Sequence, residues 1–385
     1  MKPATKPSQR PPDARLLVVH PDGAIEHTAR SRFAEYLTSG DLVVANDAAT
    51  LPASLHGVHV PTGEIVEIRL AGRRSLAPDD VQEFVAVVFG PGDHRTLTEH
   101  RPLPPVLRAG DVLALGPLRA TVLGTVGHPR LVTVRFAGSP DSIWAGIVAH
   151  GRPIQYAHLE EPLAMWDVWT SVASRPAAFE PPSASFLLDW KLLADLEARG
   201  IDFATLTHAA GISSTGDPEL DARLPLDEPY SLSAPLVESI ERAKKRGARI
   251  IALGTTVTRA LEHAAADGIL RAGDGLATQR LGADTLLRVV DGIVTGTHEP
   301  TDSHYDVLRA FVDTVTLERM SAALEQAGYR THEFGDSVMI AQPPHQGVPT
   351  QRACGALGGA CQGLGYDNSP VDHMWRTIAN PNRPL

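Results

Sequence analysis

Residues 249–262 read RIIALGTTVTRALE, an apolar run followed by a glycine and a cluster of threonines. The apolar run at 250–253 has the length of a strand that is buried on both faces of a sheet. Gly254 permits a sharp turn, and Thr255 and Thr256 place hydroxyl groups where a helix is expected to begin. The unpaired N–H groups of a helix N-terminus can bind a phosphate or a carboxylate. Such turns are also ordinary structural elements of α/β proteins, so the spacing alone leaves both interpretations open.

The composition indicates a large folded protein. The chain has 385 residues, of which 43% are apolar and 21% charged, enough for a sizeable core and two domains. The formal net charge of −10 argues against a protein that coats nucleic acid over its whole surface. A local basic patch remains compatible with this charge.

Cysteine content and hydrophobicity predict a cytoplasmic protein without a metal site. Both cysteines, Cys354 and Cys361, lie near the C-terminus, so neither a disulfide framework nor a zinc site is expected in the core. No apolar run reaches the roughly 20 residues that span a bilayer. Residues 1–12 lack the apolar centre of a signal peptide. We therefore expect no membrane partner and no metal.

The hydrophobic pattern changes twice along the chain, which predicts an insertion in an α/β fold. Strand and helix patterns occur before residue 57 and after residue 150, whereas short β-branched runs separated by Gly, Pro and Asp lie between. We predict a layered α/β core, with a parallel-rich sheet and helices, and an inserted small antiparallel β-barrel domain. The expected divisions are 13–56 (first part of the core), 57–150 (barrel), 151–343 (remainder of the core) and 344–385 (disordered tail).

The expected barrel carries arginines that have two interpretations. They form either a local patch facing RNA or ordinary solvated turn positions. These residues are Arg69, Arg73, Arg74, Arg95, Arg101 and Arg108.

The sequence GTTVTRALE at 254–262 resembles the GTTVxRxLE signature of the S-adenosylmethionine:tRNA ribosyltransferase-isomerase family. Other blocks resemble that family in the same order over residues 13–342, and the family also has a barrel inserted where residues 57–150 lie. The blocks are NDAATLPASL (46–55) for NDTRVLPARL, a P-S-A step (182–184), LDEPY (226–230) for HSExY, LLRVVDGIVT (286–295), GTHEPTDS (296–303) for NFHLPxST, and YRTHEFGDSVMI (329–340) for YxFxxYGDAMLI.

The resemblance implies an enzyme that transfers the ribosyl group of S-adenosylmethionine to the 7-aminomethyl-7-deazaguanine wobble base of tRNA, forming epoxyqueuosine and releasing adenine and methionine. The sulfonium acidifies the adjacent C5′ hydrogens, so the site needs a base, an acid for the leaving group and a water-poor pocket. The sequence does not assign the base. The catalytic candidates are Asp47, Glu228, His298 and Asp336, and the cofactor-binding candidates are Asn46, Ser183, Tyr230, Gly254, Thr255, Thr256 and Arg259.

Several polar positions of the family pattern are changed here. Arginine is replaced by Ala49 and Ser54, and histidine by Leu187, Ala209 and Leu226. One interpretation is a divergent enzyme that contacts the tRNA anticodon region differently. A second is a paralogue that uses S-adenosylmethionine on a small-molecule acceptor or as a lyase, and a third is a binding protein that does not release adenine.

Overall fold

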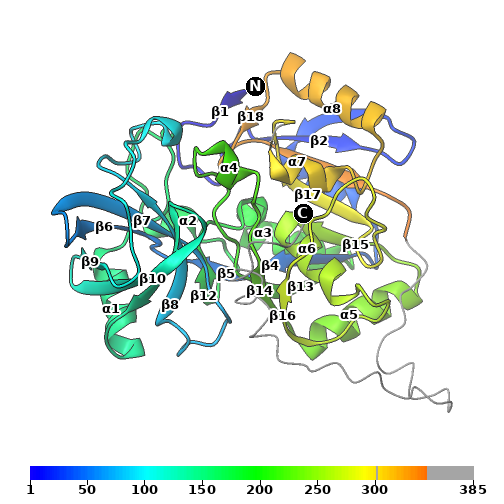
Figure 1. Cartoon of the computed structure of the whole chain (residues 1–385). Helices are drawn as coiled ribbons and strands as arrows, with labels where there is room; N and C mark the ends of the chain where they lie inside the picture. Colours follow the sequence, from blue (N-terminus) through cyan, green and yellow to red (C-terminus); the bar gives the residue numbers. More distant parts are fainter. Residues whose placement is uncertain (301, 345–385) are drawn as a thin grey trace, which may run out of the picture.

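The computed structural model describes residues 1–300 and 302–344, and its architecture confirms the predicted fold class. It consists of a nine-stranded mixed sheet with helices on both faces and a closed six-stranded barrel beside it (Figure 1). The predicted tail, with Cys354 and Cys361, lies outside the described residues except for Pro344.

The large sheet is parallel in its centre and antiparallel towards its edges. β13, β4, β15 and β17 run parallel to one another, as do β19 and β2, whereas the remaining neighbours are antiparallel. Its spatial order is β16 (Gly273–Ala277), β14 (Glu228–Leu232), β13 (Asp202–His208), β4 (Leu42–Asn46), β15 (Ile250–Leu253), β17 (Gly292–Gly296), β19 (Ser337–Ala341), β2 (Arg15–Val19) and β3 (Ile25–Ala29).

Alternating side chains of the central strands form two separate cores. Leu42 and Val44 of β4 pack with one group of helices, whereas Val43 and Ala45 pack with the other. The first group is α5 (Ala234–Lys245), α6 (Thr255–Ala264), α7 (Ser303–Leu308) and α8 (Thr314–Gln326), and the second is α3 (Trp190–Ala198) with the 3-10 helices η1 (Arg30–Tyr36) and η3 (Ser183–Leu187). The result is a three-layered core.

The barrel closes on itself through antiparallel pairs and has its own apolar interior. Its strands, in spatial order, are β10 (Leu118–His128), β11 (Leu131–Phe136), β8 (Glu83–Phe89), β7 (Glu64–Gly72), β6 (Ser54–His59) and β9 (Val112–Leu115). Helix α1 (Pro140–His150) packs Ile143 and Ile147 into this interior. The barrel was predicted to begin at residue 57, whereas its strand β6 begins at Ser54. The exact division of the chain into domains stays a prediction.

Short elements complete the described fold. The two-stranded sheets are β1 (Lys2–Pro3) with β18 (Arg330–Thr331) and β5 (Ala48–Thr50) with β12 (Arg175–Ala178), and the remaining helices are η2 (Thr98–His100), α2 (Met165–Val168) and α4 (Pro218–Asp221). Within residues 1–300 and 302–344, no helix is long and apolar enough to cross a bilayer.

Candidate functional site

Several predicted site residues lie at the carboxyl ends of the parallel strands. Asn46 ends β4, Gly254 follows β15, and His298 comes two residues after β17. In open α/β sheets this edge is where ligands bind, because helix N-termini and loops converge there. The sheet therefore gathers residues from distant parts of the sequence at one edge.

The turn between β15 and α6 leaves the N-terminus of α6 without a side-chain cap. Gly254 has a φ of 102°, a conformation that favours glycine, and a Cβ there would lie 3.3 Å from the Cβ of Ala184. The segment that begins at Ser183 is thus packed against this turn, while Thr255 and Thr256 are half-buried in the first turn of the helix. The first N–H groups of α6 have no partner within the helix and can receive an anion.

Arg259 and Glu228 form a buried ion pair between α6 and β14. The Arg259 Nη1 contacts the Oε2 atom of Glu228, and the backbone N–H of Gly211 donates to the Oε1 atom at 2.5 Å. The remaining guanidinium nitrogens donate to backbone carbonyls, with Nη2 reaching Leu226 and Ala277. Every guanidinium nitrogen thus has a protein partner, and Arg259 fixes the position of the Glu228 carboxylate.

A neutral histidine lies beside this ion pair. His208 ends β13 with none of its surface exposed, and its Nε2 is 3.4 Å from the Oε2 atom of Glu228. The pKa of His208 is lowered to about 4, mainly by burial; the Glu228 carboxylate opposes this shift and the Arg259 guanidinium adds to it. The contact is therefore not an ion pair near neutral pH. Neither ring nitrogen has a hydrogen-bond partner among the described residues.

Asn46 and Asp47 hold β4 and β13 together at their carboxyl ends. The Asn46 amide donates to the carbonyl of His208 and accepts from its N–H, at 2.9 and 3.0 Å. Asp47 accepts hydrogen bonds from the hydroxyls of Thr205 and Thr207 at 3.0 and 2.7 Å. Both side chains therefore have structural partners, and Asp47 remains half-buried.

Tyr230 faces the last turn of α6. Its hydroxyl is 3.1 Å from the Nδ1 atom of His263, and its ring belongs to the apolar core on that side of the sheet. Burial raises the pKa of Tyr230 to about 12, so the phenol stays protonated.

His298 belongs to a group of histidines after β17. Its Nε2 is 2.8 Å from the Thr295 hydroxyl, and its ring stacks on that of His304 at 5.1 Å. Burial lowers the pKa of His298 well below its usual value, and the neighbouring His304 and His332 lower it further. The imidazole is therefore neutral and resists protonation, so it can act as a hydrogen-bonding group.

Asp336 lies apart from Glu228 and His298, in an ion-pair cluster at β2 and β18. It accepts hydrogen bonds from the backbone and guanidinium groups of Arg15 and Arg330, over 2.8–3.2 Å. Burial raises the pKa of Asp336, but these hydrogen bonds outweigh that effect and hold the pKa below its usual value. These partners hold the carboxylate between β2 and β18, and its predicted catalytic role stays a prediction.

Sequence reasoning missed Glu180, the most perturbed carboxyl of this region. The Tyr156 hydroxyl donates to the Oε1 atom of Glu180 at 2.5 Å. Burial raises the pKa of Glu180 to about 7, although hydrogen bonds from Tyr156 and Ser213 lower it. Its position between Phe179 and two prolines was the available signal, since an acid in an apolar segment is expected to be desolvated.

Some of these groups influence one another electrostatically. Burial is the main cause of the raised pKa of Glu180 and of the lowered pKa of His304, and the charge of Glu333 raises both pKa values. Glu228 also raises the pKa of His304, whereas Arg259 lowers it.

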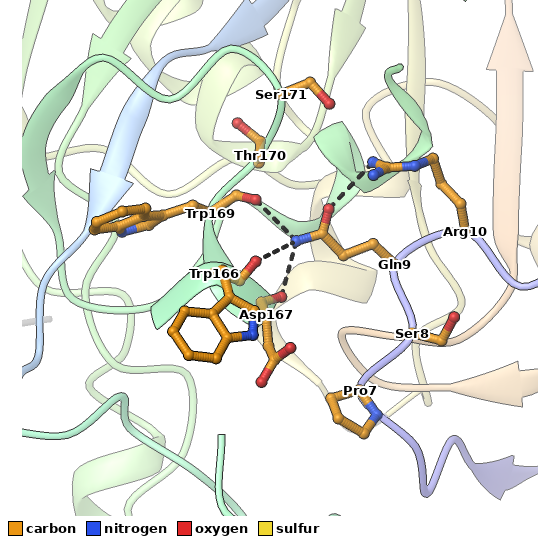
Figure 2. Close-up of a pocket in the computed structure, with 9 residues that line it drawn as sticks. All are labelled: Pro7, Ser8, Gln9, Arg10, Trp166, Asp167, Trp169, Thr170 and Ser171. Atoms are coloured by element: carbon orange, nitrogen blue, oxygen red, sulfur yellow. Dashed lines mark hydrogen bonds between the residues drawn. The ribbon is translucent and has the colours of Figure 1, made fainter. Parts of the chain in front are cut away.

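Two surface cavities lie outside this group of residues. One, of about 450 Å³, lies between residues 7–10 and 166–171, where the Gln9 amide donates to the carbonyls of Asp167 and Trp169, both at 2.8 Å (Figure 2). The other, of about 390 Å³, is lined by residues around Asp41 and Arg249. Neither contains any of the predicted site residues.

Three of the six barrel arginines form neither an RNA-facing patch nor solvated turn positions, so both predictions are wrong for them. Arg69, Arg73 and Arg101 are buried, and Arg69 and Arg101 pair with the buried Glu67. These side chains stabilise the barrel and the segments packed on it, and they do not present a basic surface.

Comparison with known proteins gives consistent matches over most of the chain. The model of a family described as "Queuosine biosynthesis protein" matches residues 2–340. Proteins named S-adenosylmethionine:tRNA ribosyltransferase-isomerase are similar, one from Thermosynechococcus vestitus (32% identity; 85% of this chain, 89% of the relative) and one from Sorangium cellulosum (31%; 88% and 94%). A crystal structure of S-adenosylmethionine tRNA ribosyltransferase from Thermotoga maritima matches with 21% identity and a TM-score of 0.45, over 88% of this chain and 95% of that one.

Proposed function

This chain belongs to the queuosine biosynthesis protein family, and from that premise we propose that it is an S-adenosylmethionine:tRNA ribosyltransferase-isomerase. The observation that carries the proposal is that relatives of this name align over 85% or more of the chain. The substrates are S-adenosylmethionine and tRNA, and the expected products are epoxyqueuosine in tRNA, adenine and methionine. No relative described above favours the small-molecule acceptor or the lyase.

The methionine carboxylate of the donor fits the N-terminus of α6. This end has no side-chain cap, and its peptide dipoles favour an anion. Thr255, Thr256 and Ser183 add hydroxyls near the same turn. The Glu228 carboxylate, held in a fixed position by Arg259 and by the Gly211 N–H, is the acidic group that we place nearest the sulfonium.

Glu180 is the group best suited to move a proton. A carboxyl with a pKa of about 7 is present in both protonation states near neutral pH, so it can remove the C5′ proton as a carboxylate and return a proton to the leaving adenine. Tyr156 orients it through the 2.5 Å hydrogen bond. His298, which is neutral, is a second polar group that we expect to hydrogen-bond the substrate.

The other predicted residues act as positioning groups. Arg259 fixes Glu228, Asn46 and Asp47 hold the ends of β4 and β13, and Asp336 supports the turn after β18. A cytoplasmic location and contact with the tRNA anticodon region are parts of the proposal, since the wobble base is the acceptor.

The proposal is tested by incubating the purified protein with S-adenosylmethionine, with and without tRNA that carries 7-aminomethyl-7-deazaguanine. We expect adenine and methionine in the chromatogram only with this tRNA, together with a mass increase at the wobble base. Release without tRNA would indicate a lyase and contradict the proposal, as would the absence of turnover.

A matched pair of variants tests the role of Glu180. Glu180→Gln keeps the side-chain shape but cannot take up the proton, so adenine release should fall by at least about 100-fold, the usual size of an acid–base contribution. Glu64→Gln changes an exposed carboxyl on the barrel and should have the activity of the unaltered enzyme. Equal activity of the two variants would remove Glu180 from the mechanism.

A further inference from the structure

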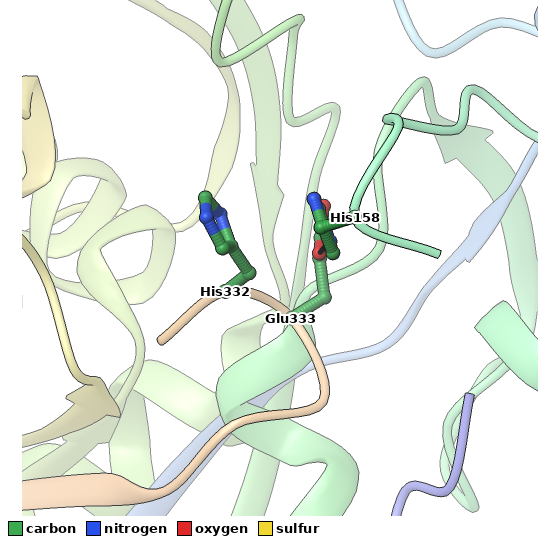
Figure 3. A group of neighbouring side chains, drawn as sticks. All are labelled: His158, His332 and Glu333. Atoms are coloured by element: carbon green, nitrogen blue, oxygen red, sulfur yellow. Dashed lines mark hydrogen bonds and ion pairs between the residues drawn. The ribbon is translucent and has the colours of Figure 1, made fainter. Parts of the chain in front are cut away.

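Two histidines and a glutamate from separate segments converge next to the site. His158 lies in the loop between α1 and α2, whereas His332 and Glu333 lie in the turn between β18 and β19 (Figure 3). One ligand atom of each residue lies within 4.8 Å of those of the other two. The Nε2 of His158 and the Oε2 of Glu333 are 3.1 Å apart.

The backbone holds this arrangement at a conformational cost. Among the described residues, His332 is the one non-glycine residue with a positive φ, 69°. A left-handed conformation costs a residue with a Cβ about 1–2 kcal/mol, and such strain is typical of functional sites. The turn is fixed around it, because the Gly335 N–H donates to the His332 carbonyl at 2.9 Å and a Cβ on Gly335 would lie 2.3 Å from the Arg330 oxygen.

We propose that His158, His332 and Glu333 form a binding site for a divalent transition-metal ion such as Zn²⁺. Two imidazoles and one carboxylate are a frequent ligand set for such ions, and three protein ligands leave a position for water or substrate. Ligand atoms around tetrahedral zinc are about 3.3 Å apart, given bonds of about 2.0–2.2 Å. The 3.1 Å between His158 and Glu333 already matches this spacing.

One ring must turn when the ion binds. The rings of His158 and His332 stack at 4.2 Å with 13° between their planes, and an ion cannot lie in both of two nearly parallel ring planes. His332 is exposed, so its imidazole can rotate towards the carboxylate without displacing core side chains. No arginine or lysine among the described residues makes an ion pair with Glu333, so no cation has to be displaced.

The site adjoins the residues described above. His158 stacks on Tyr156 at 6.3 Å, and the charge of Glu333 acts on Glu180. A bound ion would therefore lie near Tyr156 and Glu180, and its open position could take an oxygen or nitrogen ligand from a substrate. The inference rests on the three ligands and does not depend on the proposed reaction.

The test measures metal binding by the full chain without S-adenosylmethionine or tRNA. After treatment with a chelator, the protein is titrated with ZnCl₂ by calorimetry, and a Co²⁺ titration follows the visible absorption of a low-symmetry site. We expect one ion per chain and at least a tenfold loss of affinity in each of His158→Gln, His332→Asn and Glu333→Gln. Asn tolerates a positive φ, so His332→Asn removes the imidazole and keeps the turn.

His20→Gln is the matched control, because His20 contacts Glu26 at 3.2 Å and no third ligand lies beside them among residues 1–300 and 302–344. Its affinity should equal that of the unaltered protein, and thermal unfolding identifies any variant that fails to fold. Less than one ion per chain, or unchanged affinity in folded His332→Asn and Glu333→Gln, would overturn the proposal.

Discussion

The buried imidazole of His208 makes the fold sensitive to acid. Its side chain is fully buried between β13 and the Glu228–Arg259 pair, and neither ring nitrogen has a hydrogen-bond partner in the described part of the chain. Burial lowers its pKa to about 4. Protonation of the folded protein therefore places a cation in a desolvated position beside a second cation, the Arg259 guanidinium.

The size and sign of the effect follow from proton linkage. The unfolded chain binds this proton with a pKa of 6.5 and the folded chain at about 4, so the unfolded state holds more protons between these values. Stability is thus complete above pH 6.5 and falls as the pH falls towards 4. The full loss is about 3 kcal/mol, and about 2 kcal/mol of it occurs between pH 7 and pH 5.

The assay compares urea unfolding at pH 7, 6 and 5, followed by tryptophan fluorescence. His208→Gln removes the titrating group. Between pH 7 and pH 5, the free energy of unfolding of the unaltered protein should therefore fall by about 2 kcal/mol more than that of the variant. His20→Gln, at a half-buried histidine of the N-terminal hairpin, is the control for the loss of a histidine. Identical slopes for the unaltered protein and His208→Gln would refute the reasoning, whatever the absolute stability of the variant.

Three further predictions concern the same region. Burial raises the pKa of Glu180 from 4.5 to about 7, so between these values the folded state binds one proton more than the unfolded state, and the free energy of unfolding should fall by up to about 3 kcal/mol as the pH rises from 4.5 through 7. In urea unfolding at pH 5 and 8, Glu180→Gln should abolish this contribution to the pH dependence. Glu228→Gln leaves Arg259 buried without a counter-charge and should cost about 3–5 kcal/mol in urea unfolding, whereas a loss below about 1 kcal/mol would contradict the buried pair. Gly254→Ala should weaken S-adenosylmethionine binding in calorimetry, because the added Cβ meets Ala184. The control Gly247→Ala, also at a positive φ but with nothing within 4 Å of the added Cβ, should lower stability alone, and equal affinities of the two variants for S-adenosylmethionine would remove the turn from the cofactor site.

The predictable part of the fold is the part governed by local periodicity. The apolar run at 250–253 and the glycine after it predicted β15, the turn and α6, because strand burial and helix initiation depend on neighbouring residues. The β-branched runs between 57 and 150 likewise predicted the barrel, which the structure confirms. Resemblance supplied the family, which the family match confirms over residues 2–340.

The remaining features depend on contacts between distant segments. The sequence offered no metal-ligand set, because His158 lies far along the chain from His332 and Glu333. Arg69 and Arg101 looked like surface residues, since their shared counter-ion Glu67 can be identified only once the barrel closes. Glu180 was missed because its apolar sequence neighbours only hint at desolvation, whereas the raised pKa comes from burial by distant segments such as Tyr156 and Ser213. The candidate roles of Asp47, Glu228, His298 and Asp336 stay predictions.

The strand order of the large sheet has a consequence for synthesis on the ribosome. β19, near residue 340, lies between β17 and β2, so the N-terminal hairpin of β2 and β3 has no neighbour in the sheet until the last described strand is made. A nascent chain released before Ser337 leaves one edge of β2 unpaired, with Leu16 and Val18 lacking part of their packing. Translation must therefore pass residue 341 before β2 can gain its second neighbour in the sheet, so this edge of the N-terminal hairpin stays unpaired for most of synthesis.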